Sequence, residues 1–303
     1  MADRQAFQQN IAGLLAKLDD PDADLRYMSL NDLYTILSAP GSGYFQDQRS
    51  STRLVEGLLK ALDDQHGDVQ NQALKCLGPL AIRLPFESLT PLLESLTNLT
   101  ASQTIDTSVP NTALRVIVDT LPRPQAGQPA QQNTIAAYSA VSKVLIPRLV
   151  GPTPSPSSRR GSIVRGMLEK DPSKGFSSDA IDVLIKVVTC FGPLLQESEL
   201  ASLSEPVMAI IHNDTAGTVV TKRALTAISA LVLHFSDTQL DAFVATLVET
   251  LSSPNISTVH RRHLIATVGA IASSAPAKFG PHLNTLAPFV FSAVGEESVS
   301  TVG

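Results

Sequence analysis

Residues 18–26 have the sequence LDDPDADLR, and residues 62–70, 44 positions later, have the sequence LDDQHGDVQ. The two stretches share Leu-Asp-Asp, a later Asp and the apolar residue that follows it. In both, an apolar-periodic segment precedes an Asp-rich turn and a second such segment follows the turn. We expect Asp24 and Asp68 to be the N-caps of the second segments, because carboxylates there accept backbone N–H groups and suit the positive end of a helix. The repeat therefore predicts pairs of helices joined by short turns.

The same pattern continues along the chain at intervals of 39 to 44 residues. An apolar residue near the start of the second segment recurs at Val69, Val109, Val220 and Val259. Two-helix units with this period are typical of HEAT repeats, which stack continuously because no single unit can bury its apolar face alone. We therefore predict an all-α fold, an α-solenoid (superhelix) of HEAT repeats.

The repeats predict six full two-helix units plus a final unpaired helix, in a single solenoid over residues 1–303. The predicted units are 1–45, 46–85, 86–125, 126–195, 196–236 and 237–278, followed by a half unit at 279–303. Their first helices are predicted at 11–18, 54–62, 89–99, 135–149, 200–211, 240–251 and 282–294.

Composition agrees with this fold and excludes some functions. Apolar residues make up 43% of the chain and aromatic residues only 5%, with no Trp, which disfavours an aromatic-cored sandwich or barrel. The formal net charge is −5, from 23 Lys and Arg against 28 Asp and Glu. A phosphate-backbone binder needs the opposite sign, so we expect no nucleic-acid partner.

A Pro/Ser-rich insertion interrupts the fourth unit at 151–177, beginning GPTPSPSSRRGS. Proline at alternate positions excludes a helix there, and we expect a disordered loop. Within it, the sequence RRGS at 159–162 is either a solubilised loop or a target for a kinase or for nuclear import.

The Asp-rich turn at 20–24 resembles the opening of a calcium loop. Asp20, Asp22 and Asp24 have the D-x-D-x-D spacing. However, Leu25 stands where the loop needs Gly, and Asn31 stands where it needs a bidentate Glu. The pattern therefore favours an inter-helix turn.

No other motif indicates chemistry. His260 and His263 lie three residues apart without a third ligand nearby, which favours a solvated polar face over a metal site. Cys76 and Cys190 lie in apolar runs without a CxxC neighbour, which is typical of buried thiols. We expect no catalytic residues, no cofactor and no metal, and therefore no enzyme. With no signal peptide or membrane span evident, we expect a protein of the cytoplasm and nucleus with no membrane partner.

Basic residues gather in the predicted second helices, the row that lines the concave side of HEAT solenoids. They predict a basic-leaning stripe that contacts a partner; the alternative is a set of ordinary solvated positions, some paired with Asp32, Asp119 and Asp182. The candidate partner-facing residues are Arg26, Asn31, Asn71, Lys75, Arg115, Lys186, Lys222, Arg223, Arg261 and Arg262.

The final predicted helix has no partner helix after it. This leaves Leu283, Leu286, Phe289 and Val290 as a candidate docking end for further repeats. The chain is then either a truncated fragment or one half of a split protein whose other half docks here.

Two stretches go beyond generic HEAT character. Residues 24–33 (DLRYMSLNDL) and 68–80 (DVQNQALKCLGPL) resemble the amino-terminal repeats of the cullin-associated and neddylation-dissociated family, and 221–223 and 266–275 do so more weakly. Members of that family are much longer than this chain.

This resemblance implies a non-enzymatic regulator of cullin-RING ubiquitin ligases. It would bind the carboxy-terminal region of an unneddylated cullin and its RING subunit, block cullin neddylation and assist substrate-receptor exchange. A separate or missing carboxy-terminal polypeptide would complete it. The repeats alone leave open a generic HEAT adaptor, such as a nuclear-transport or phosphatase scaffold.

Overall fold

The computed structural model describes residues 2–40, 48–101, 106–152 and 165–300, with side chains up to residue 293. Within these ranges every regular element is a helix, and the only β-type pairing is an isolated bridge between Asp171 and Gly175. The chain divides into two compact units, Met1–Arg148 (unit 1) and Leu149–Gly303 (unit 2). Each unit is described by itself.

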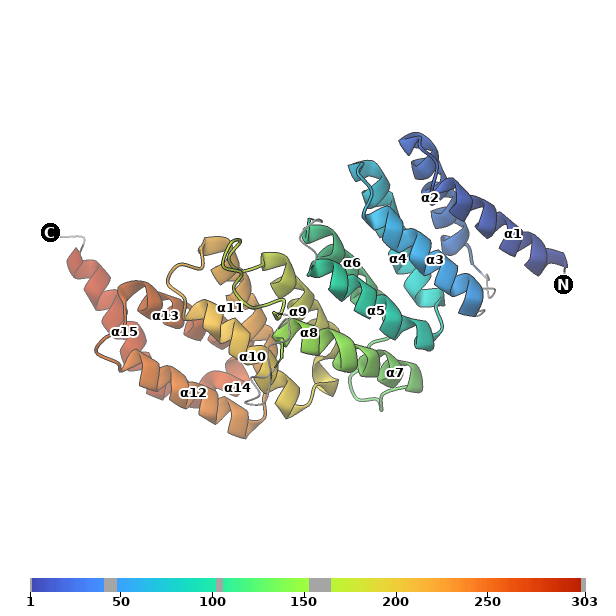
Figure 1. Ribbon diagram of the computed structural model, residues 1–303. Helices are drawn as coiled ribbons and strands as arrows, with labels where there is room; N and C mark the ends of the chain where they lie inside the picture. Colours follow the sequence, from blue (N-terminus) through green and yellow to red (C-terminus); the bar gives the residue numbers. More distant parts are fainter. Residues whose placement is uncertain (1, 41–47, 102–105, 153–164, 301–303) are drawn as a thin grey trace, which may run out of the picture. The chain divides into compact units, whose positions relative to one another are not determined.

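Unit 1 is a stack of helix pairs in two layers (Figure 1). The second helices α2, α4 and α6 pack side by side, and the first helices α1, α3, α5 and α7 with η2 form the other layer. The bounds are α1 Ala2–Lys17, α2 Ala23–Ser38, α3 Gln48–Leu62, α4 Gly67–Arg83, α5 Phe86–Thr100, α6 Ser108–Thr120, α7 Gln132–Ala140, η2 Val141–Leu145 and α8 Ile146–Val150, the last of which crosses into unit 2.

Unit 2 repeats the arrangement (Figure 1). The second helices α9, α11 and α13 pack in sequence, α10 and α12 cover α11 and α13, and α15 contacts both α12 and α13. The bounds are α9 Ser178–Phe191, η3 Gly192–Leu194, α10 Glu197–Ile211, α11 Thr218–Val232, α12 Asp237–Leu251, α13 Thr258–Ser274, α14 Pro276–Phe279, η4 Gly280–His282 and α15 Leu283–Ser300. The predicted all-α architecture of HEAT-type helix pairs is confirmed.

The buried positions of α11 and α13 correspond at an offset of 40 residues. The alignment of Val220 with Val259 is therefore wrong by one residue, and Val219 is the equivalent of Val259. The physical reason is packing: Ala224 is fully buried whereas Leu225 is only half-buried, so Ala224 is the equivalent of Leu264. The other buried pairs at this offset are Ala227 with Thr267, Ile228 with Val268 and Leu231 with Ile271.

The predicted N-caps are also wrong. Asp22 caps α2, and its side chain accepts the backbone N–H of Asp24 at 2.9 Å. His66 occupies the N-cap position of α4 without a side-chain cap bond. Asp24 and Asp68 instead lie in the first turns, because each helix begins earlier than predicted; there their charge still suits the helix dipole.

The predicted Pro/Ser-rich insertion is described only in part. Residues 153–164, with the RRGS sequence, lie outside the described residues. Residues 165–177 form a folded loop in which Asp171 and Gly175 exchange backbone hydrogen bonds of 2.9 and 2.8 Å. Hydrogen bonds from the hydroxyl and backbone N–H of Ser173 lower the pKa of the Asp171 carboxyl to about 2. Leu168 is buried and donates its backbone N–H to the carbonyl of Leu149, which anchors the loop to unit 2.

Candidate interaction surfaces

The ten predicted stripe residues divide evenly between the two units. All lie on second helices, as predicted, but their surroundings differ. Unit 1 carries Arg26, Asn31, Asn71, Lys75 and Arg115; unit 2 carries Lys186, Lys222, Arg223, Arg261 and Arg262.

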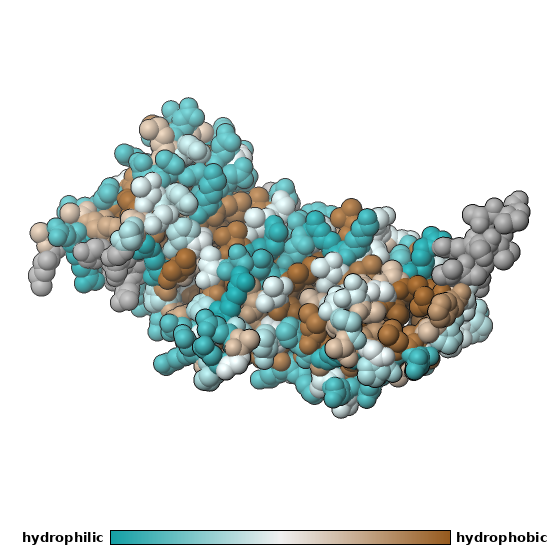
Figure 2. Space-filling view, turned by 180° about the vertical axis from the view of Figure 1, so that it is seen from behind, coloured by the Kyte–Doolittle hydropathy of each residue, from teal (hydrophilic) through white to brown (hydrophobic). Residues whose placement is uncertain are grey.

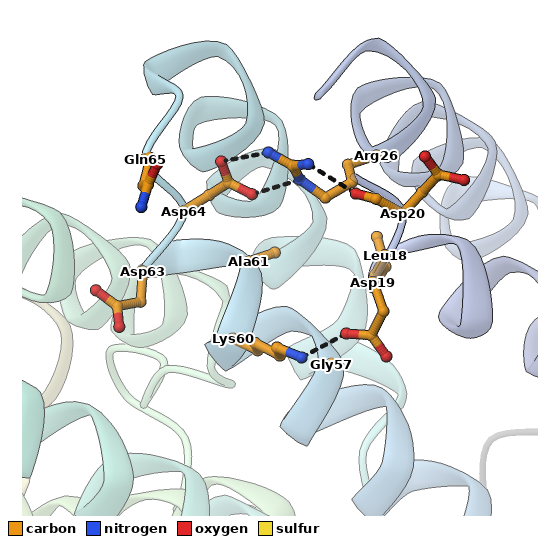
Figure 3. Close-up of a pocket in the computed structure, with 10 residues that line it drawn as sticks. All are labelled: Leu18, Asp19, Asp20, Arg26, Gly57, Lys60, Ala61, Asp63, Asp64 and Gln65. Atoms are coloured by element: carbon orange, nitrogen blue, oxygen red, sulfur yellow. Dashed lines mark hydrogen bonds and ion pairs between the residues drawn. The ribbon is translucent and has the colours of Figure 1, made fainter. Parts of the chain in front are cut away.

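Arg26 is engaged within the repeat stack, with a side chain only 14% exposed. Its Nε donates to Asp64 Oδ2 at 2.8 Å, Nη2 to Asp64 Oδ1 at 3.1 Å, and Nη1 to the carbonyl of Asp20 at 2.7 Å (Figure 3). The hydrogen bond to Asp64 raises the pKa of Arg26. Burial alone would raise the pKa of Asp64, but the bonds from Arg26 and from the His66 N–H lower it. Arg26 thus joins the turns of two successive repeats.

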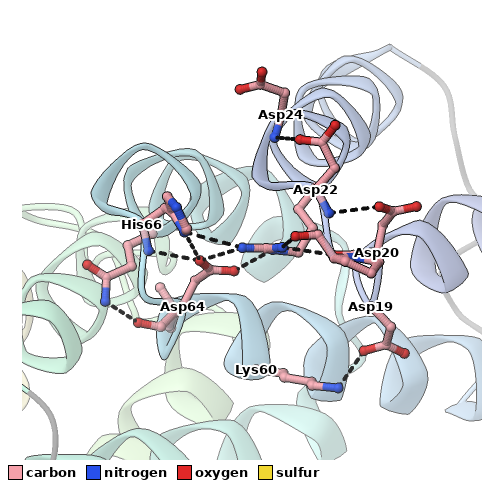
Figure 4. A network of polar contacts seen from close by, with 11 residues as sticks. Asp19, Asp20, Asp22, Asp24, Lys60, Asp64 and His66 are labelled. Atoms are coloured by element: carbon pink, nitrogen blue, oxygen red, sulfur yellow. Dashed lines mark hydrogen bonds and ion pairs between the residues drawn. The ribbon is translucent and has the colours of Figure 1, made fainter.

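Arg26 and Asp64 line a pocket between the first two inter-helix turns (Figure 3), and Figure 4 shows the network of polar contacts around them. Lys60 pairs with Asp19 on its wall. Asp20 Oδ1 accepts the N–H of Asp22, and Asp22 Oδ1 in turn accepts that of Asp24. Two of the three carboxylates that resembled a calcium loop, Asp20 and Asp22, therefore accept hydrogen bonds from the turn backbone. Among the described residues, no group of three or more His, Cys, Asp or Glu is arranged to hold a metal ion.

The other stripe residues of unit 1 differ in their exposure and in their contacts. Asn71 and Lys75 are exposed on α4. Asn31 accepts a hydrogen bond from the buried Gln72 at 3.3 Å, which links α2 to α4. Arg115 is half-buried, and its Nη2 reaches the hydroxyl of Thr112 at 3.5 Å.

The helix pairs α10–α11 and α12–α13 of unit 2 separate acidic from basic residues. Helices α10 and α12 contain acidic residues and no Lys or Arg, whereas α11 and α13 contain Lys and Arg and no acidic residue. The acidic residues are Glu197, Glu199, Glu205, Asp237, Asp241 and Glu249; the basic residues are Lys222, Arg223, Arg261 and Arg262.

The basic residues of unit 2 differ in their contacts. Arg223 pairs with Asp182 of α9, and Lys186 and Arg261 are half-buried. Lys222 and Arg262 are exposed. The stripe in this unit therefore presents two exposed cations, Lys222 and Arg262.

The prediction of a stripe missed two exposed apolar residues on the same helices. Val219 is 61% exposed and Val259 is 40% exposed. Aligning α11 with α13 at an offset of 40 would have revealed them. In that alignment Val219 matches Val259, and the basic residue three positions after each valine, Lys222 or Arg262, also matches.

The predicted docking end lies on α15. Leu286 is buried, Phe289 and Val290 are half-buried, and Leu283 is 46% exposed. Phe291, which the prediction omitted, is 74% exposed. Hydrophobic surface gathers beside the grey residues at this end of the chain (Figure 2).

The histidines of α13 are not a solvated polar face. Nδ1 of His212, at the end of α10, lies 2.7 Å from Nε2 of His260, with the two rings edge to face. Nδ1 of His263 lies 3.0 Å from the carbonyl of Ile211. Burial and the neighbouring His260 lower the pKa of His212. Both histidines therefore join α10 to α13.

The cysteines are buried, as predicted. Burial raises the pKa of the Cys76 thiol to about 12, and the thiol donates to the carbonyl of Leu30 at 3.3 Å. A thiol so rarely ionised is a packing residue and not a nucleophile. None of the helices within the described residues has the length and hydropathy to span a bilayer.

Comparisons with known proteins agree with the fold. Yeast importin-beta (Kap95p) matches with a TM-score of 0.54 and 15% identity, over 96% of this chain and 33% of that one. Kap121p matches with a TM-score of 0.57 and 17% identity, over 98% of this chain and 28% of that one. Stacked helix pairs of this kind define the chain as a HEAT-repeat α-solenoid protein.

Sequence comparison is more specific. Residues 88–302 match the family described as "Cullin-associated NEDD8-dissociated protein 1 N-terminal part". A relative from Emericella nidulans, "Cullin-associated NEDD8-dissociated protein 1, N-terminal part", is 70% identical over 99% of this chain and 88% of its own length. An Arabidopsis thaliana relative, "Cullin-associated NEDD8-dissociated protein 1", is 25% identical over 92% of this chain, which spans only 20% of that protein. The chain belongs to the cullin-associated NEDD8-dissociated protein family, as its resemblance indicated.

Proposed function

We propose that this protein is a non-enzymatic scaffold that binds the unneddylated core of cullin-RING ubiquitin ligases. It would contact the cullin carboxy-terminal region and the RING subunit, block cullin neddylation and assist substrate-receptor exchange. The observation that carries the proposal is the 70% identity, over nearly the whole chain, to a relative named as cullin-associated. The likeness to importin-beta and Kap121p is a likeness of fold and does not favour a transport adaptor.

A quantitative pull-down tests this function. The protein would be immobilised and exposed to a purified cullin-RING core in unneddylated and neddylated forms, with and without the polypeptide that carries the remaining repeats. We expect retention of the unneddylated core and slower neddylation of the retained cullin. Equal retention of both forms, or retention of neither in either condition, would contradict the proposal.

We further propose that a separate polypeptide with the remaining repeats docks on α15. Two observations support this: the relative from Emericella nidulans is named as an N-terminal part, and Leu283 and Phe291 expose apolar surface on α15. Large apolar side chains exposed together favour a contact with a partner. Co-elution of the two polypeptides in gel filtration at micromolar concentration is the expected result, and separate elution would refute docking.

We also propose that the protein acts in the cytoplasm and nucleus, where the proposed ligase partners would be met. Imaging of a fluorescent fusion against compartment markers tests this. Fluorescence confined to the secretory pathway would contradict it.

A further inference from the structure

The exposed faces of α11 and α13 carry the same short pattern. Val219 precedes Lys222 by three residues, and Val259 precedes Arg262 by three residues. Residues three apart lie on one face of a helix. The two patterns are 40 residues apart, the offset that also aligns the buried positions of these helices. Because α11 and α13 pack side by side, the four residues form a ladder with one apolar step, Val219 and Val259, and one basic step, Lys222 and Arg262.

The pattern is confined to these two helices of unit 2. At the equivalent positions of α9, the residues are Asp179 and Asp182. Asp182 is already paired with Arg223. By contrast, no carboxylate of the described residues lies within ion-pair distance of Lys222 or Arg262, so the ladder has two available positive charges.

Internal stability does not explain the ladder. Lys222 and Arg262 occupy equivalent positions on adjacent helices, and two like charges at neighbouring positions do not attract one another. The acidic residues of α10 and α12 lie in the other layer, and Asp182 of α9 is already paired with Arg223. Packed helix axes are about 8–10 Å apart, and outward-pointing side chains add to this, so salt screens most of the attraction between the layers. Exposed valine side chains do not stabilise the fold either, because their apolar surface stays in contact with water.

We infer that Val219, Lys222, Val259 and Arg262 form a docking face for an acidic segment of a protein partner. Carboxylates of that segment would pair with Lys222 and Arg262, and an apolar side chain between them would cover the two valines. This inference rests on the proposed function and deepens it, since the cullin-RING core is the partner that would carry the segment. Charge complementarity selects an acidic partner over a nucleic acid, because apolar contacts to valine add nothing to phosphate binding.

Two pairs of substitutions separate the charged and apolar parts of this face. Affinity for the unneddylated cullin-RING core would be measured at about 50 and about 300 mM NaCl, a range over which screening of exposed charges changes strongly. We expect K222E/R262E to weaken binding about tenfold at the lower salt, with a smaller difference at the higher salt. We expect V219S/V259S to weaken binding by a similar factor at both concentrations, because salt does not screen an apolar contact.

A matched control preserves the total charge change. K143E/K170E alters two exposed lysines outside the second helices by the same amount, and we expect it to bind like the wild type. Thermal unfolding of every variant would be compared with that of the wild type. Since all the substituted residues are exposed, we expect the same Tm throughout.

Zero-length carbodiimide cross-linking locates the segment directly. We expect mass spectrometry to find Lys222 joined to an Asp or Glu of the cullin-RING core. If the wild type binds the core but neither pair of substitutions changes its affinity and Lys222 forms no cross-link, the docking face is refuted while the proposed function stands. If the wild type does not bind the core at either salt concentration, the proposed function fails and the inference fails with it.

Discussion

The carboxylate of Asp64 accepts two hydrogen bonds from the guanidinium of Arg26, a residue 38 positions earlier in the chain. Arg26 belongs to the second helix of the first repeat, and Asp64 belongs to the turn of the second repeat. Unit 2 has a related contact, in which Arg223 of α11 reaches back 41 positions to Asp182 of α9. Basic residues of the second helices therefore fall into two groups: some join neighbouring repeats, and others, such as Lys222 and Arg262, are exposed.

Removing the charge of Asp64 tests the joining role. We expect D64N to lower the Tm by a few degrees at pH 7, because Arg26 is then left partly buried without its counter-ion. The pKa of Asp64 is lowered in the folded state, so its contribution is complete above the unfolded pKa of about 3.9 and is lost as pH falls below it. The difference in Tm between the wild type and D64N should therefore become small near pH 3.

The neighbouring Asp63 provides the control. It is exposed in the same turn and lines the same pocket. We expect D63N to unfold like the wild type in circular dichroism melts. Equal melting of D64N and D63N at pH 7 would show that the ion pair adds no stability.

Two glycines of unit 2 should respond to alanine in opposite directions. A Cβ at Gly166 would lie 2.5 Å from the carbonyl oxygen of Val150, so the backbone at the base of the folded loop must shift. We expect G166A to destabilise unit 2 by about 1–3 kcal/mol. Gly269 lies in α13, where an added Cβ would meet nothing within 4 Å, and G269A should stabilise by about 0.5–1 kcal/mol through helix propensity. Urea titrations measure both, and a stable G166A would contradict close packing of the loop base.

The contact between His212 and His260 should make unit 2 sensitive to mild acid. The 2.7 Å hydrogen bond needs one neutral ring nitrogen as its acceptor, and two protonated rings would repel. Because burial and the nearby His260 lower the pKa of His212 in the folded state, its contribution is complete above the unfolded pKa of about 6.5 and is lost as pH falls below it. We expect the Tm to fall between pH 7.5 and 5.5, and to fall less steeply in H212N.

A second histidine must be separated from this effect. Burial and Lys278 also lower the pKa of His234, so this residue contributes to the same pH range. The single variants H212N and H234N should each reduce the slope in part, and the double variant should reduce it further. An unchanged slope in H212N would mean that the histidine contact does not titrate with folding.

Substitutions on α15 should separate docking from folding. Phe291 is 74% exposed, so F291S should change the free energy of unfolding by less than about 0.5 kcal/mol while weakening co-elution with the remaining repeats. Leu286 is 1% exposed, so L286A should cost about 2–5 kcal/mol. If F291S co-elutes with the remaining repeats as the wild type does, Phe291 is not part of a docking surface.

Local sequence was sufficient to predict the helices. The Asp-rich turns, the apolar periodicity and the recurring interval indicate helix pairs, because the pattern of buried residues follows the helical repeat. Local sequence was less reliable for features that depend on a single position, such as an N-cap or the exact alignment of two helices. Asp24 was predicted to be the N-cap of α2, but Asp22 holds that position and accepts the backbone N–H of Asp24. Val220 was aligned with Val259, but the buried positions of the two helices show that Val219 is its equivalent.

The sequence by itself determined that this chain forms stacked helix pairs and belongs to its family, because repeat period, helix propensity and motif are properties of neighbouring residues. Only the tertiary structure decided which charges are available. Arg26 and Lys222 both look like basic residues of a second helix, yet one is held by Asp64 and the other is exposed. An ion pair between repeats forms only when stacking brings together side chains that are about 40 residues apart in the sequence. A pattern of neighbouring residues does not show which of these side chains will meet.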